Sequence, residues 1–122
     1  MTNSNFEHFW LNEGFTVFTE RKIVGRMRGE AARHFSAIMG WKDLKESVIE
    51  VQGEDNPLTA LVVGLTGVDP DDAFSVVPYV KGCTFLWYLE NTVGGACEFL
   101  KIKRNKVYTE MIILSNQFEN QI

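Results

Sequence analysis

The stretch HFWLNEGFTVFTER, residues 8–21, decides the fold of the first part of the chain. From Phe9 to Val24 the apolar side chains recur closer to every 3.6 residues than to every second residue, and the run is longer than a typical strand. We therefore expect a helix here, which Gly25 or Gly29 ends or bends.

Two carboxylates, Glu13 and Glu20, lie on nearly the same face of this helix, because seven residues are close to two helical turns. Glu13 has large apolar neighbours, so if it is buried it has to be paired, protonated or bound to a metal. One carboxylate could bind a metal, and the other could hydrogen-bond to the ligands of that metal. The simpler interpretation is that both are solvated or paired with Arg or Lys one turn away.

The rest of the chain also predicts helices. An apolar pattern with intervening charges runs over residues 30–51, and Gly53 is suited to end it. The three prolines fall within residues 53–78, which we expect to form mainly a loop. A third apolar stripe over residues 80–93 predicts a helix that the pair Gly94-Gly95 ends.

Other reactive side chains have ordinary interpretations. His8 and His34 belong to no HxxxH or HExxH pair, so their spacing does not predict a metal site. Two cysteines, Cys83 and Cys97, are too few for a disulfide framework and are expected to be small buried residues.

An acidic cluster in the loop, VDPDDAF, contains Asp69, Asp71 and Asp72. A calcium loop normally supplies more oxygen donors at regular spacing, so we expect this cluster to cap a helix N-terminus. Tyr79 follows Pro78 at the start of the third helix, where its phenol could face a cleft or have only a structural role.

The composition excludes several classes of protein. With 122 residues, 45% hydrophobic and 23% charged, the chain has the length and composition of one globular domain. Its net charge of -4 gives no electrostatic reason to bind nucleic acid or an anionic membrane. No apolar run approaches the roughly 20 residues that span a bilayer, and no signal peptide is recognisable, so we expect a cytoplasmic protein.

Four stretches, taken in order, resemble one enzyme family. They are HFWLNEGFTVFTER (8–21), GEAARHFSAIMGWKDLKESV (29–48), DPDDAFSVVPYVKG (69–82) and FLWYLENTVGG (85–95). They resemble the zinc aminopeptidases of peptidase family M1, whose signature is HExxH, eighteen residues and then Glu. Within that family the resemblance is to the branch of leukotriene A(4) hydrolase and the soluble aminopeptidases.

The resemblance implies a role for several residues. Glu13 would be the zinc ligand that follows HExxH. Glu20 would be a carboxylate that contacts the metal ligands without binding the metal itself. Tyr79 would donate a hydrogen bond to the oxyanion of the tetrahedral intermediate. Val80 stands where the family usually has glutamate, which removes a charge and leaves the phenol.

For lipid substrates the resemblance implies less. Asp71 matches the aspartate that is linked to water attack in the epoxide hydrolase branch, but Phe74 stands where that branch often has a second tyrosine. Peptide hydrolysis is therefore better supported than leukotriene A(4) epoxide hydrolysis. Phe6 and Phe9 match an aromatic substrate pocket near the metal, and Phe74 is grouped with them.

Part of the family's machinery is absent from this sequence. HExxH does not occur, and the second histidine would have to lie before Met1. A catalytic zinc normally has three protein ligands, so we expect this chain alone to retain no Zn2+ and to be inactive. We interpret residues 1–99 as a partial catalytic domain and residues 100–122, with the basic run 101–106, as a tail without a family match. A partial gene model, a read-through of non-coding sequence and a truncated isoform are the three explanations we consider.

The sequence thus predicts a mainly α fold, equivalent to the second half of a thermolysin-like metallopeptidase domain. The first functional hypothesis is a fragment of a cytoplasmic zinc aminopeptidase that acts on peptides. The alternative is a non-catalytic helical interaction protein, which could dock onto the missing half of the domain through its exposed core face.

Overall fold

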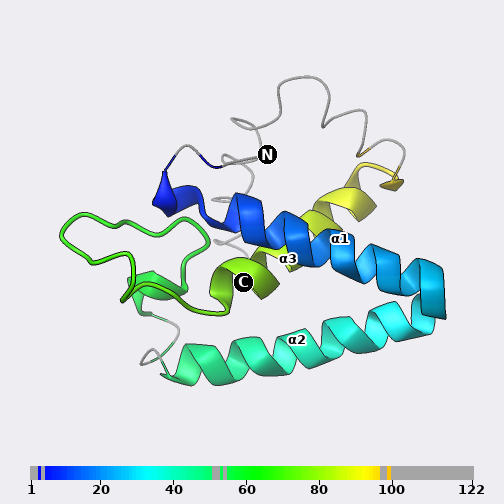
Figure 1. The fold of residues 1–122 in the computed structure, drawn as a ribbon, viewed down its shortest axis with the longest axis horizontal. Coiled ribbons are helices and arrows are strands. Elements are labelled where there is room, and N and C mark those ends of the chain that lie inside the picture. Colours follow the sequence, from blue (N-terminus) through cyan, green and yellow to red (C-terminus); the bar gives the residue numbers. More distant parts are fainter. Residues whose placement is uncertain (1–2, 4, 51–52, 54, 97–98, 100–122) are drawn as a thin grey trace.

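The computed structural model describes residues 3, 5–50, 53, 55–96 and 99 (Figure 1). The predictions for Cys97 and for residues 100–122 concern residues outside this part of the chain. In the described part the elements are helical and no strand occurs. In order they are the 3-10 helix η1 (Phe6–His8), α1 (Trp10–Arg28), α2 (Glu30–Glu50), the 3-10 helix η2 (Pro57–Thr59) and α3 (Val77–Thr92).

Helices α1 and α2 form an antiparallel hairpin, and α3 crosses α1 (Figure 1). Gly29 joins the first two helices with a φ of 91°, a conformation that favours glycine. Its N–H donates to the Gly25 carbonyl at 2.9 Å, which completes the last turn of α1. Gly25 is therefore inside α1, and Gly29 is the glycine that ends it.

The crossing of α1 and α3 brings backbone against backbone. A Cβ on Gly14 would lie 2.9 Å from the Cα and carbonyl carbon of Gly82, and a Cβ on Gly82 would lie 3.0 Å from the Cα of Gly14. No larger residue fits at this point without moving a helix. Because Gly14 follows Glu13 and Gly82 lies three residues after Tyr79, the crossing also sets the distance between those two side chains.

The main core lies around this crossing. The Trp10 and Phe85 rings, both completely buried, meet edge to face with their centroids 5.5 Å apart. Leu61 is buried in the same cluster, so part of the proline-bearing loop contributes to the core. A second cluster of Leu44, Val77 and Val80 joins α2 to the start of α3.

An ionic network joins all three helices near the C-terminal end of α3. Glu90 of α3 accepts from Lys22 of α1, and its second oxygen lies 3.4 Å from a guanidinium nitrogen of Arg33 on α2. The Glu90 side chain is only 6% exposed, so both cations compensate a buried carboxylate. The Arg33 guanidinium also lies 4.6 Å from the centroid of the Trp87 ring.

Two hydrogen bonds attach the loop between α2 and α3 to its neighbours, one to α3 and one to η1, which precedes α1. The Lys81 ammonium donates to the Thr59 carbonyl at 3.2 Å, and the Leu65 N–H donates to the Glu7 carboxylate at 3.2 Å. The loop thereby lies beside the N-terminal ends of α1 and α3.

Several details differ from the sequence predictions. Helix α3 begins three residues earlier than expected, at Val77, with Pro78 in its first turn, where the missing N–H costs nothing. The acidic cluster caps no helix, and that prediction is wrong: Asp69 accepts from the Asp71 N–H within a loop turn, at 3.0 Å. Ser75 instead accepts from the Val77 N–H at the start of α3, at 3.2 Å.

Candidate active site

Glu13 and Tyr79 come together from two different helices. Glu13 lies in the first turn of α1, Tyr79 in the first turn of α3, and both are partly buried. The two N-terminal turns are neighbours because the helices cross at Gly14 and Gly82, as described above. A carboxylate and a phenol therefore share one site, although 66 residues separate them in the sequence.

The electrostatics of Tyr79 reflect this pairing. Burial raises the pKa of the Tyr79 phenol above its ordinary value, and the negative charge of Glu13 and a side-chain hydrogen bond to it raise the pKa further. Tyr79 consequently keeps its proton well above neutral pH and can act as a hydrogen-bond donor in this site.

Two aromatic rings pack against the phenol of Tyr79, and one of them comes from the loop between α2 and α3. The rings of Phe9, Phe74 and Tyr79 contact one another pairwise with centroid distances of 6.2 Å, and Tyr79 meets both of the others nearly edge to face. Phe6 adds a fourth ring, 6.4 Å from Phe9. The four aromatic residues that the sequence singled out, from η1, the linker before α1, the loop and α3, thus form one cluster beside Glu13.

Asp71 lies in the loop that leads to α3. It is exposed, and its carbonyl accepts from the Phe74 N–H at 3.3 Å, so the two residues share one turn. The loop therefore presents a carboxylate three residues before the exposed ring of Phe74.

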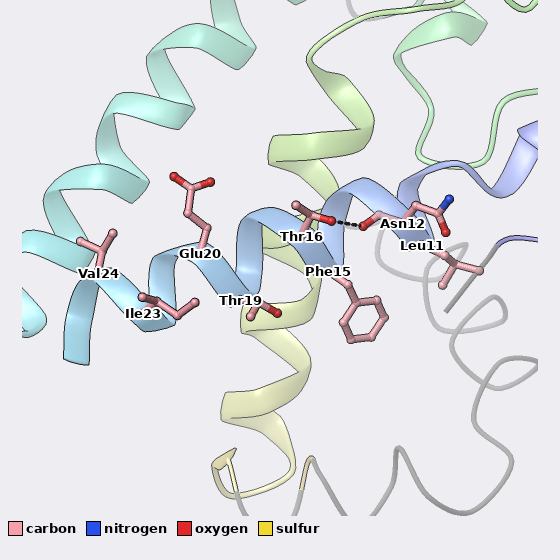
Figure 2. Close-up of a pocket in the computed structure, with 8 residues that line it drawn as sticks. All are labelled: Leu11, Asn12, Phe15, Thr16, Thr19, Glu20, Ile23 and Val24. Atoms are coloured by element: carbon pink, nitrogen blue, oxygen red, sulfur yellow. Dashed lines mark hydrogen bonds between the residues drawn. The ribbon is translucent and has the colours of Figure 1, made fainter. Parts of the chain in front are cut away.

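Glu20 is exposed and is one of the residues that line a groove of about 570 Å³ along α1. Its side chain points to the other side of α1 from the side chains of Phe15 and Thr19 (Figure 2). Figure 2 also shows the Thr16 hydroxyl, which donates to the Asn12 carbonyl at 2.8 Å. The other groove residues are Leu11, Phe15, Thr19, Ile23 and Val24.

The described residues do not by themselves fit a zinc ion. Among them, no three His, Cys, Asp or Glu side chains lie together in a way that could hold a metal. His34 instead contacts the Trp87 ring, with centroids 5.3 Å apart. Zinc sites take three or four protein ligands, so the described residues alone form no complete zinc site.

Sequence reasoning missed Arg21, which is buried where the three helices meet. Its guanidinium donates to the Cys83 sulfur at 3.2 Å, and a Cβ on Gly40 of α2 would lie 2.0 Å from the same guanidinium. The glycine on α2 therefore leaves room for the arginine of α1. A glycine in the middle of a helical pattern was the available signal, but it does not identify which side chain fills the space.

Comparisons with known proteins identify similar sequences. The sequence model of the Peptidase family M1 domain matches residues 1–110. Leucine aminopeptidase 2 of Ajellomyces capsulatus is 61% identical over 94 residues, which cover 77% of this chain and 15% of that protein. The leukotriene A-4 hydrolase homolog of Botryotinia fuckeliana is 57% identical over 94 residues, or 77% of this chain and 14% of the relative.

Solved structures show the same similarity in three dimensions. Yeast LTA4 hydrolase in complex with bestatin superposes with a TM-score of 0.75 at 49% identity, over 80% of this chain and 16% of that structure. The chain therefore spans about one sixth of the relatives that it matches. Within the described residues, no helix is both long and apolar enough to cross a membrane.

Proposed function

The chain belongs to peptidase family M1, and we propose that it is the portion of a zinc aminopeptidase that supplies one metal ligand, Glu13, and one oxyanion donor, Tyr79. Its length relative to LTA4 hydrolase and the leucine aminopeptidases makes it a fragment of such an enzyme. Removal of N-terminal residues from peptides in the cytoplasm is the activity that we propose for the complete protein.

The observation that carries this proposal is the pairing of Glu13 with Tyr79. A metallopeptidase needs a carboxylate that holds the metal close to a neutral donor for the oxyanion. Here one helix supplies the carboxylate, another supplies the phenol, and the raised pKa of Tyr79 keeps the donor protonated. Bound zinc would supply Lewis acidity, and this chain would provide one of its ligands.

Tyr79 would act on the charge that develops during peptide hydrolysis. When water adds to a peptide carbonyl, the oxygen becomes an oxyanion, and a donor already in place stabilises it more than it stabilises the substrate. The ring contacts with Phe9 and Phe74 limit how far the phenol can turn. Glu20 would support the metal ligands from the adjoining groove.

The aromatic cluster would bind the apolar part of the substrate. Phe6 and Phe74 expose about two thirds of their surface beside Tyr79, so a substrate side chain could contact both rings. For a lipid epoxide, Asp71 would have to direct the water. Phe74 offers no hydroxyl for that reaction, which makes epoxide hydrolysis the secondary activity.

A second candidate function is a non-catalytic interaction protein. The groove along α1 and the exposed apolar side chains of α1 and α2 favour it, because a folded chain normally covers such surfaces. In that case the partner is the remainder of an M1 domain.

A chimera separates the two candidates. We would replace the matching segment of yeast LTA4 hydrolase with residues 5–96 of this chain and measure zinc content and aminoacyl-arylamide cleavage. The proposal requires a chimera that retains zinc and cleaves, and a Glu13→Ala chimera that loses its zinc. The matched control is Glu46→Ala, an exposed glutamate on α2, which should keep both properties. A folded chimera without activity, or zinc retention in Glu13→Ala, would refute the catalytic proposal.

A further inference from the structure

The short helix η1 carries one ring of the aromatic cluster but has little packing of its own. It contains no buried residue, and its N-cap Asn5 makes no side-chain cap hydrogen bond. Its aromatic residue, Phe6, is 65% exposed and contacts the ring of Phe9 at a centroid distance of 6.4 Å. A helix of three residues with so little buried surface needs a further contact to keep a fixed position.

Glu7, in the middle of η1, makes such a contact. Its partly buried carboxylate accepts from the Leu65 N–H at 3.2 Å, although 58 residues separate the two in the sequence. Figure 1 shows η1 beside the loop between α2 and α3, to which Leu65 belongs. A carboxylate forms a stronger hydrogen bond with a backbone N–H than an uncharged acceptor does. The middle residue of η1 therefore attaches this helix to the loop.

Leu65 lies where the loop leaves the core. Four residues earlier, Leu61 is almost completely buried. The Leu65 carbonyl accepts from the N–H three residues later at 3.1 Å, which starts a turn, and most of residues 66–74 are exposed. The hydrogen bond from Leu65 to Glu7 thus fixes the start of the exposed segment that carries Phe74.

This hydrogen bond relates the two most exposed rings of the aromatic cluster to each other. Phe6 directly precedes Glu7 on η1, and Phe74 belongs to the loop that Glu7 binds. The two rings expose 65% and 66% of their surface, and each contacts Phe9, the second with a centroid distance of 6.2 Å. The separation of Phe6 and Phe74 therefore depends on the position of η1 relative to the loop.

We propose that Glu7 is a positioning residue that sets the separation of Phe6 and Phe74 and thereby selects substrates with a large apolar N-terminal side chain. This role rests on the aminopeptidase function proposed above, because the substrate is the one that the aromatic cluster would bind. Rings that are already held in place lose less conformational freedom when a side chain binds between them. Glu7 acts through the two rings and contacts no reacting atom.

The chimera with yeast LTA4H tests the selectivity. Glu7→Ala should raise KM for a leucine arylamide about tenfold, because a hydrogen bond to a charged group is lost, and should leave kcat and zinc content unchanged. KM for an alanine arylamide should change less than about twofold, since a methyl group is too small to contact both rings. Glu7→Gln should recover most of the affinity, because its amide oxygen accepts from the same N–H. Glu46→Ala, the matched control on the exposed face of α2, should keep both KM values.

A general loss of stability gives a different result. It would reduce the amount of folded enzyme and so lower the apparent kcat for both substrates equally, without changing the ratio of the two KM values. Two KM values that rise together in Glu7→Ala, or do not rise, overturn the proposal. A Glu7→Gln chimera that behaves like Glu7→Ala also overturns it, because the hydrogen bond is then not the cause.

Hydrogen exchange of the Leu65 amide in the full chain, followed by NMR, tests the contact without enzymatic activity. The amide should be protected in the wild type, exchange at least about tenfold faster in Glu7→Ala, and be protected again in Glu7→Gln. A wild-type amide without protection, or protection that Glu7→Ala leaves unchanged, overturns the proposal. An inactive chimera refutes the aminopeptidase function instead, and the exchange rates still decide whether Glu7 holds the loop.

Discussion

Gly14 of α1 and Gly82 of α3 lie in direct backbone contact, at the point where these two helices cross. The contact determines more than packing, because each glycine is close in sequence to a residue of the candidate active site. A change that separates the two helices at this point also separates Glu13 from Tyr79.

Gly14→Ala should destabilise the chain. Alanine favours a helix over glycine by about 1 kcal/mol, but its Cβ would lie 2.9 Å from the backbone of Gly82, which cannot rotate away as a side chain can. We expect a net loss of about 1–2 kcal/mol in the free energy of unfolding, measured by urea denaturation. Gly64→Ala is the control, since a Cβ there meets no atom within 4 Å. Equal stability of wild type and Gly14→Ala would mean that the helices are further apart than described.

Glu90→Gln should also destabilise the chain, for an electrostatic reason. The substitution leaves Lys22 and Arg33 beside a neutral amide in a site where Glu90 is almost completely buried. Breaking a buried ion pair costs about 3–5 kcal/mol, and because Lys22 is one third exposed we expect about 2–3 kcal/mol. Asp43→Asn, which removes an exposed carboxylate, should change the unfolding free energy by less than about 0.5 kcal/mol. A similar small effect for Glu90→Gln would show that water already screens the network.

The sequence predicted most of the helical fold because the relevant signals are local. Helical periodicity located the three helices, and Gly29, Gly53, Gly94 and Gly95 all adopt the positive φ that their expected roles require. The start of α3 was misplaced because Pro78 at a helix start and proline in a loop look alike in a sequence. The burial of Arg21 could not be predicted, since it depends on Gly40 of another helix.

The residues of the candidate site were identified through family resemblance, whereas their spacing left other interpretations open. Spacing placed Glu13 and Glu20 on one helical face, but it gave no information about Tyr79. Tyr79 lies beside Glu13 because α1 and α3 cross. Long-range pairing of this kind depends on tertiary contacts that no local pattern encodes. The family roles of Glu13, Glu20, Tyr79 and Asp71, and the boundary at residue 99, stay predictions.

Stability should fall at alkaline pH because of Cys83. Burial raises the pKa of its thiol above the ordinary value, although the neighbouring Arg21 guanidinium opposes this shift. A raised pKa in the folded state means that folding favours the neutral thiol. This contribution is complete below the pKa of the unfolded thiol, about 8.5, and is lost as the pH rises through the folded pKa.

The measurement is the urea midpoint between neutral pH and pH of about 10, in a Cys97→Ser background that leaves one thiol to titrate. Cys83→Ala should lower the midpoint at neutral pH, because it leaves a small cavity, and should show a weaker decline with rising pH. Parallel curves for the two proteins would mean that Cys83 does not contribute to the alkaline loss.

Tyr79→Phe provides the most direct test of the mechanism. Phenylalanine keeps the ring that packs on Phe9 and Phe74 and removes only the hydroxyl that faces Glu13. In the active chimera, loss of one oxyanion donor should lower kcat by a factor of about 10²–10³ with little change in KM, because the donor acts on charge that is absent from the bound substrate. Zinc content should not change, which distinguishes this variant from Glu13→Ala. Tyr88→Phe, an exposed tyrosine further along α3, serves as the control and should keep its turnover. If Tyr79→Phe keeps wild-type kcat, the phenol has no part in the reaction; if KM rises alone, the hydroxyl binds substrate and not the oxyanion.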